Sequence, residues 1–176
     1  GKDSLYNESP MGSVTPTLLV TAVGILPDVC RAVSVELKNT GNPLYLIGET
    51  YAELGGSEYF KLSRVAGGSV PKVRLPKAKR AMQAVTRAID MGYVRACHDL
   101  SEGGLAVAAA EMALGSSLGV QINLDAVPTS TRLRDDVILL SESNSRFLIE
   151  ADSRRRRGFE ALMRGTPHAM IGRVQK

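Results

Sequence analysis

The segment from His98 to Leu105 (HDLSEGGL) holds the residues best suited to chemistry in this chain. It joins an apolar run to a helix that begins near Gly103, and the backbone N–H groups at such a helix start attract anions. Asp99 could hold a magnesium ion that bridges phosphate oxygens, because this cation prefers oxygen ligands. Alternatively, Asp99 or Ser101 simply caps the helix. His98 is either a structural histidine or a phosphate contact.

Two further segments carry residue types that bind anions. Residues 1–4 read Gly-Lys-Asp-Ser, which combines a flexible backbone, a cation, a carboxylate and a hydroxyl. This segment is either a phosphate or sugar contact or an exposed loop. The second of these is Gly48-Glu49 followed by residues 54–58, Leu-Gly-Gly-Ser-Glu, which form either an anion-binding nest or a tight turn before a short helix. The sequence contains no His/Cys metal-binding spacing, no Gly-x-Ser-x-Gly motif and no Walker-type phosphate loop.

Helices and strands must alternate in the second half of the chain to position these segments. Apolar residues at helical spacing, together with Pro and Gly at the ends, predict helices over residues 76–91, 105–114, 133–140 and 155–164. Short apolar runs predict strands over residues 93–97, 120–124, 147–150 and 169–173. The helix over 105–114 has Glu111 as its only charged residue, so we expect it to be buried.

The first half of the chain predicts shorter strands. Residues 18–23 form a mostly apolar run, and residues 33–37 alternate between apolar and polar side chains. The turn residues at 39–43 then lead into a strand over 44–47, so we expect a hairpin. These elements predict an α/β (α+β) fold with a mixed sheet covered by helices.

Composition narrows the class of protein. The 176 residues are 44% apolar and 23% charged, which suits one globular domain or one domain with part of a second. No apolar stretch is long enough for a membrane span, and Cys30 and Cys97 suit a reduced cytosolic protein. The net charge of +4 includes the run from Arg154 to Arg157, which we interpret as a solvated face. The absence of Trp and the 5% aromatic content argue against single-stranded nucleic acid as a partner.

Four segments occur here in an order and spacing typical of one enzyme family: residues 1–8 (GKDSLYNE), 44–48 with 53–58 (LYLIG, ELGGSE), 98–106 (HDLSEGGLA) and 141–147 (SESNSRF). On these residues the chain resembles the synthetase subunit of phosphoribosylformylglycinamidine synthase. The Gly-Gly helix start also occurs in aminoimidazole ribonucleotide synthetase and selenophosphate synthetase. Residues 1–8 and 141–147 narrow the resemblance to the synthase.

The resemblance implies a domain organisation and an activity. Residues 1–26 would be the tail of a second, barrel-forming N-terminal domain, and residues 27–176 would form the second C-terminal α/β domain of the aminoimidazole ribonucleotide synthetase type. The implied enzyme is a cytoplasmic ligase that uses ATP and magnesium to convert formylglycinamide ribonucleotide to formylglycinamidine ribonucleotide in purine biosynthesis. A glutaminase subunit supplies ammonia and a small accessory subunit completes the complex, with no nucleic acid or membrane involved.

The resemblance also implies roles for individual residues. It places Gly1 at a nucleotide contact, Ser4 at a substrate contact and Asp99 at a magnesium ion in an auxiliary nucleotide site. Lys2 falls at a magnesium-ligand position, where a charged lysine cannot ligate the ion, so Lys2 could pair with phosphate while Asp3 supplies the carboxylate. The family's catalytic histidine and main ATP-binding segment lie outside the matched part, so no catalytic residue is assigned and we expect this fragment to be inactive alone.

Two alternatives remain open at this point. The chain could be a non-catalytic scaffold domain of the same complex, which docks the glutaminase and the accessory subunit. Less favoured is a related ATP-using enzyme of the aminoimidazole ribonucleotide synthetase type. The first two interpretations differ in whether Asp99 and Ser4 touch a ligand.

Overall fold

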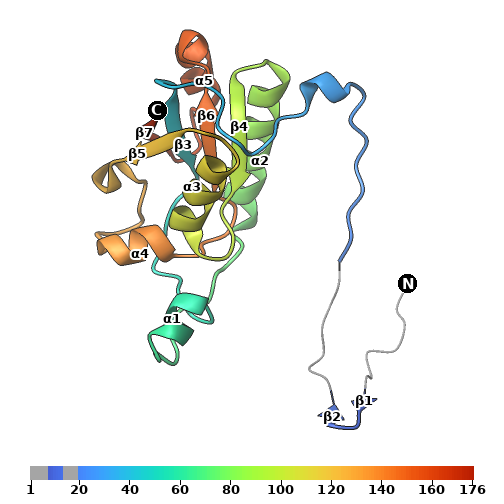
Figure 1. The fold of residues 1–176 in the computed structure, drawn as a ribbon, viewed down its shortest axis with the longest axis vertical. Coiled ribbons are helices and arrows are strands. Elements are labelled where there is room, and N and C mark those ends of the chain that lie inside the picture. Colours follow the sequence, from blue (N-terminus) through green and yellow to red (C-terminus); the bar gives the residue numbers. More distant parts are fainter. Residues whose placement is uncertain (1–7, 14–19) are drawn as a thin grey trace.

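The computed structural model describes residues 8–13 and 20–176, and begins with an extended arm (Figure 1). Strands β1 (Glu8–Ser9) and β2 (Gly12–Ser13) pair antiparallel. Residues 20–32 are all exposed and contain one 3₁₀ turn, η1 (Val29–Arg31). Of the strand predicted over 18–23, the described residues 20–23 are not in a strand. Gly1, Lys2, Asp3 and Ser4 lie outside the described residues.

A five-stranded sheet forms the centre of the remaining chain. Its strands are β3 (Pro43–Ile47), β4 (Val94–Asp99), β5 (Gly119–Ile122), β6 (Phe147–Ala151) and β7 (His168–Gln175), in the spatial order β4-β6-β3-β7-β5. The expected fold class, a sheet covered by helices, is confirmed. Its strand pairs are all antiparallel rather than mixed, and a parallel bridge joins Thr50 to Thr129 outside the strands.

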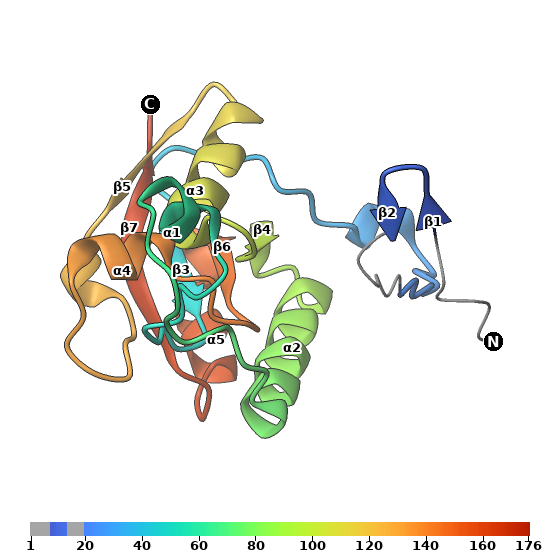
Figure 2. The same cartoon turned by 90° about the horizontal axis from the view of Figure 1, so that it is seen from below.

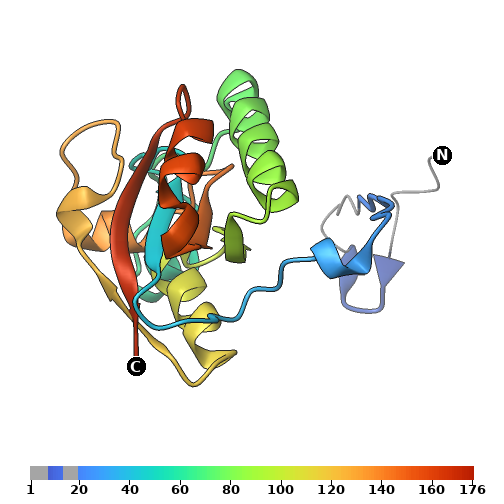
Figure 3. The same cartoon turned by 90° about the horizontal axis from the view of Figure 1, so that it is seen from above.

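Helices cover both faces of this sheet (Figures 2 and 3). Every residue of β3 is buried, because its side chains alternate between two apolar cores. Leu44 and Leu46 pack in the core with α3 (Gly104–Leu114) and α4 (Asp135–Leu140). Tyr45 packs on the opposite face with α2 (Leu75–Asp90) and α5 (Arg156–Leu162). An apolar strand buried on both faces explains why this segment lacks the usual alternation with polar residues.

The helices begin and end close to their predicted positions. In α2, Pro76 lies in the first turn, the buried face consists of Ala78, Ala81, Val85 and Ala88, and Gly92 follows with φ +66°. Helix α3 buries Leu105 fully, but Leu114 is 84% exposed, so the expectation that this helix is buried holds for one face only. The Ser57 hydroxyl caps α1 (Glu58–Leu62) by accepting a hydrogen bond from Phe60 N. Of the two alternatives for residues 54–58, this favours the tight turn before a short helix over the anion-binding nest. Among the described helices none is long and apolar enough to cross a membrane.

The predicted hairpin between residues 33–37 and 44–47 is wrong. Residues 33–37 form no strand, and Leu37 is the only one of them that is buried. Their backbone makes one hydrogen bond to the sheet, from Cys97 N to Ser34 O. The reason lies in β3, whose two edges are already paired with β6 and β7. Two further 3₁₀ turns, η2 (Leu124–Ala126) and η3 (Ser153–Arg155), connect the later elements.

Candidate functional site

One end of the sheet brings together three of the segments singled out in the sequence. Phe147 is the register partner of both Ile47 and Asp99, so the loops that follow β3 and β4 lie beside the loop that precedes β6. We define the motif end of the sheet as residues 48–53, residues 98–104 and residues 141–146; the second range comprises the end of β4, the loop after it and the first residue of α3. Segments far apart in the chain therefore share one location.

The N-terminus of α3 is held by a residue from the neighbouring loop. Gly103 is the N-cap residue, with φ +74° and no side-chain capping bond of its own. Its N–H donates to Glu142 Oε1 at 3.0 Å. The alternative that Asp99 or Ser101 caps this helix is therefore wrong, because the left-handed Gly-Gly start brings the first N–H group to a carboxylate from another loop.

Asp99 presents a largely free carboxylate at the end of β4. Its side chain is 64% exposed, Oδ2 accepts from the Ser101 hydroxyl at 2.9 Å, and Oδ1 lies 3.4 Å from His98 Nδ1. His98 Nε2 lies 2.8 Å from Glu111 Oε2, which favours the structural interpretation of this histidine. Within residues 8–13 and 20–176 no three His, Cys, Asp or Glu side chains form a metal-binding group. A single carboxylate still suits magnesium, which is commonly held through one or two carboxylates plus phosphate oxygens.

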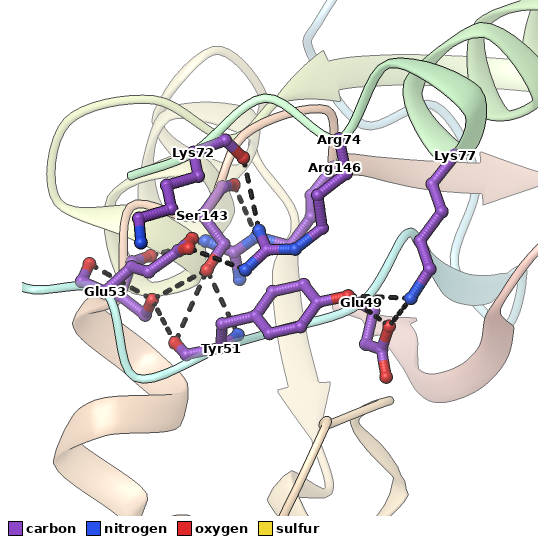
Figure 4. A network of polar contacts seen from close by, with 9 residues as sticks. Glu49, Tyr51, Glu53, Lys72, Arg74, Lys77, Ser143 and Arg146 are labelled. Carbon is purple, nitrogen blue, oxygen red and sulfur yellow. Dashed lines mark hydrogen bonds and ion pairs between the residues drawn. The ribbon is translucent and has the colours of Figure 1, made fainter. Parts of the chain in front are cut away.

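A second polar network joins the start of α2 to the segment after β3 (Figure 4). The Arg74 guanidinium lies 3.4 Å from the centre of the Tyr51 ring and pairs with Glu53 Oε1 at 2.9 Å. Lys77 Nζ lies 2.5 Å from Glu49 Oε2 and 2.8 Å from the Tyr51 hydroxyl, which in turn donates to Glu49. The hydrogen bond from Lys77 holds the pKa of the Glu49 carboxyl below its ordinary value. Arg74 and Lys77 are thus each paired with a carboxylate of the same chain.

Arg146 fixes the loop 141–146 from inside the protein. Its side chain is fully buried and donates to Ser143 O at 2.8 Å, to Thr50 Oγ1 at 3.0 Å and to Ser141 O. Burial lowers the pKa of this guanidinium to about 10. The Ser143 hydroxyl also accepts from Tyr51 N at 3.0 Å. Side chains of the loop 141–146 are therefore bonded to the backbone of Tyr51 and to the side chain of Thr50.

Residue-level reasoning from the sequence did not identify these partnerships. The bond between Arg146 and Thr50, like the one between Glu142 and Gly103, joins residues that are far apart in the chain. The one available signal was that Glu142 and Arg146 fall within a matched segment, residues 141–147. Of the residues to which the resemblance assigns a role (Gly1, Lys2, Ser4 and Asp99), only Asp99 lies among those that the structure describes.

Residues 39–176 match the family model "AIR synthase related protein, C-terminal domain", and the chain belongs to this family. The chain is 42% identical over 151 residues to the subunit PurL of phosphoribosylformylglycinamidine synthase from Methanothrix thermoacetophila, covering 85% of this chain and 19% of that protein. Over 179 residues it is 36% identical to the PurL of Alkaliphilus metalliredigens, covering 99% and 23%. The resemblance noted in the sequence is confirmed, and the chain spans about a fifth of the length of these relatives.

Solved structures support the fold. The PurL of Thermotoga maritima, solved in complex with FGAR, superposes with a TM-score of 0.73 at 20% identity, covering 84% of this chain and 26% of that one. At 20% identity, this likeness shows a shared fold and nothing further.

Proposed function

We propose that this chain is the C-terminal part of a PurL-type ligase, which amidates formylglycinamide ribonucleotide with ATP and with ammonia from a glutaminase subunit. The observation that carries this proposal is the 42% identity to a PurL over 85% of the chain. The relative is named a subunit, and the Thermotoga protein was solved with FGAR, which supports partner subunits and this substrate. A cytoplasmic location and the small accessory subunit belong to the same proposal.

The division of the chain at residue 26 is also proposed. The family match begins at residue 39, and residues 20–32 are exposed in an arm that precedes the sheet. Both observations support a boundary in this region. On this proposal Gly1 contacts nucleotide and Ser4 contacts substrate, while Lys2 pairs with phosphate and Asp3 supplies a carboxylate.

Asp99 is proposed as a magnesium ligand beside a nucleotide. Two observations support this role. The Asp99 carboxylate is exposed at the motif end, and apart from His98 no cationic side chain in the described structure is paired with it. A magnesium ion there would neutralise phosphate charge, while the Ser101 hydroxyl orients the Asp99 carboxylate through its hydrogen bond.

A non-catalytic scaffold role is the second candidate, and one observation favours it. At the start of α3 the backbone N–H of Gly103 already donates a hydrogen bond to the Glu142 carboxylate. A phosphate at this helix start would have to compete with that carboxylate. In the scaffold interpretation the domain docks partner subunits and binds no nucleotide.

The deciding experiment uses Asp99 in a protein of the relatives' full length. We expect the Asp99→Asn variant to fold and to lose most of the rise in melting temperature that Mg-ADP produces, because a neutral amide is a poor ligand for a hard dication. Ser101→Ala is the matched control, since it removes the hydrogen bond to Asp99 without removing the charge. An equal rise in wild type and Asp99→Asn favours the scaffold.

A second measurement addresses the 176-residue chain itself. We expect it to melt cooperatively and to hydrolyse no ATP, because the catalytic histidine of the family lies outside the matched part. ATP hydrolysis proportional to the concentration of the purified chain, and absent from a mock preparation, contradicts the proposal that this chain is an inactive part.

A further inference from the structure

A small hollow lies at the motif end of the sheet, between the start of α2 and the turn after β3. Its volume is about 20 Å³, which is room for about one water molecule. Three cationic side chains border it: Lys72, Arg74 and Lys77. The small residues Ala78 and Ala81 of α2 form its apolar side. With Glu49 as the carboxylate of the lining, the side chains around the hollow keep a formal positive excess.

Besides Tyr51, whose hydroxyl is already bonded to Glu49 and Lys77, the uncharged polar side chains in the lining are Asn144, Ser145 and Thr166. Asn144, Ser145 and Thr166 make no side-chain hydrogen bond within the described parts of the chain. Thr166 is 8% exposed as a residue, but its hydroxyl is not among the fully buried polar atoms that lack a partner, so this oxygen is open to solvent. These three groups have donors available for a molecule that enters the hollow.

Glu49 contributes the carboxylate in this lining. Lys77 belongs to the first turn of α2, where the positive end of the helix dipole disfavours a cation, so this lysine needs an anionic partner. Glu49 Oε2 supplies it at 2.5 Å, with a side chain that is 21% exposed. The carboxylate thus occupies the position in which a bound anion would meet Lys77.

We propose that this hollow is a phosphate-binding site and that Glu49 is its internal competitor. A phosphate group would displace Glu49 from Lys77 and accept hydrogen bonds from Ser145, Thr166 and Asn144. A tetrahedral anion with several acceptor oxygens matches one ammonium, two hydroxyls and one amide. A neutral ligand would not replace the charge that Lys77 requires. The inference does not depend on the ligase activity proposed above.

The test compares melting temperatures of the full 176-residue chain as inorganic phosphate is added at constant ionic strength. A ligand that binds only the folded state stabilises it by RT ln(1 + [L]/Kd), so a tighter ligand gives a larger rise in melting temperature at the same concentration. We expect Lys77→Met to abolish the rise and Lys79→Met to leave it unchanged, because Lys79 lies on the exposed face of the same helix. Glu49→Gln should bind phosphate about tenfold more tightly, since it loses the competing charge.

Each outcome is decisive. A phosphate-induced rise that is equal in wild type and Lys77→Met overturns the proposal, and so does a Glu49→Gln variant that binds no more tightly than wild type. A rise seen only in Glu49→Gln supports it, with the carboxylate prevailing in the wild type. If Lys77→Met does not fold, Thr166→Val provides the test, because it keeps the side-chain shape and must bind phosphate several-fold more weakly. Ribose 5-phosphate as a second ligand distinguishes an ester from free phosphate, and binding of either supports the site.

Discussion

Gly104, the first residue of α3, lies against the backbone at the end of α4, and replacing it with alanine is a sharp test of this contact. Its φ is +61°, which side chains rarely adopt. A Cβ at this position would lie 2.3 Å from Ser141 O and 2.9 Å from Leu139 O. Both are backbone atoms, so they cannot turn aside as the end of a long side chain could. Gly104→Ala must therefore strain the backbone and displace the segment 139–141.

The magnitude follows from two contributions. A left-handed conformation costs a non-glycine residue roughly 1–2 kcal/mol, and overpacking against a fixed neighbour adds about 1–3 kcal/mol. Gly56→Ala is the matched control: its φ is +83°, but no atom lies within 4 Å of the added Cβ. At roughly 2–4 °C per kcal/mol, we expect Gly104→Ala to lower the melting temperature by about 4–20 °C and Gly56→Ala by about 2–8 °C.

The assay is a thermal melt of both variants and the wild type, followed by far-ultraviolet circular dichroism at one protein concentration. The expected order of melting temperatures is wild type, Gly56→Ala, Gly104→Ala. Equal melting temperatures for the two variants would refute the close approach of Gly104 to the 139–141 backbone, since both share the conformational cost.

Three further outcomes are expected. Leu105→Ala should lower the free energy of unfolding by about 2–5 kcal/mol in urea melts, because it opens a cavity in the core under α3. Arg146→Met should cost at least about 3 kcal/mol, since it leaves three buried acceptors without their donor, and Arg146→Lys should recover part of that loss. The hydrogen bonds from Tyr45 and then Arg156 lower the pKa of Glu160. The ionised Glu160 therefore stabilises the folded state above its ordinary pKa of 4.5, and this stabilisation is lost as the pH falls through the lowered pKa. The difference in free energy of unfolding between wild type and Glu160→Gln should shrink between pH 7 and strongly acidic pH.

The helices could be predicted from sequence because their signals are local. Pro76, the buried alanines of α2 and Gly92 all act within one segment, so the pattern alone defined that helix. The alternation over 33–37 is local too, yet it misled, because β3 takes its neighbours from the C-terminal part of the chain. Nothing in those five residues shows that the partner strand is already paired on both edges.

The candidate site, like the fold, could be predicted from the sequence only in part. Its location could be inferred, since the matched segments do meet at one end of the sheet. The bonds that organise it could not, because the partner of Gly103 is Glu142 and the partner of Thr50 is Arg146. Capping oxygens usually come from the residue before a helix, and here the oxygen comes from a loop beyond α4.

The strand order has a consequence for how the protein is made. During synthesis β3 leaves the ribosome early, but both of its partners begin late, at Phe147 and His168. Until then an apolar strand meant for the centre of a sheet has two open edges, which are templates for pairing with other chains. Long-range pairing of this kind also slows folding. A chain that stops before β7 leaves one edge of β3 permanently open, so we expect nascent or truncated chains to depend on chaperones far more than the finished domain does.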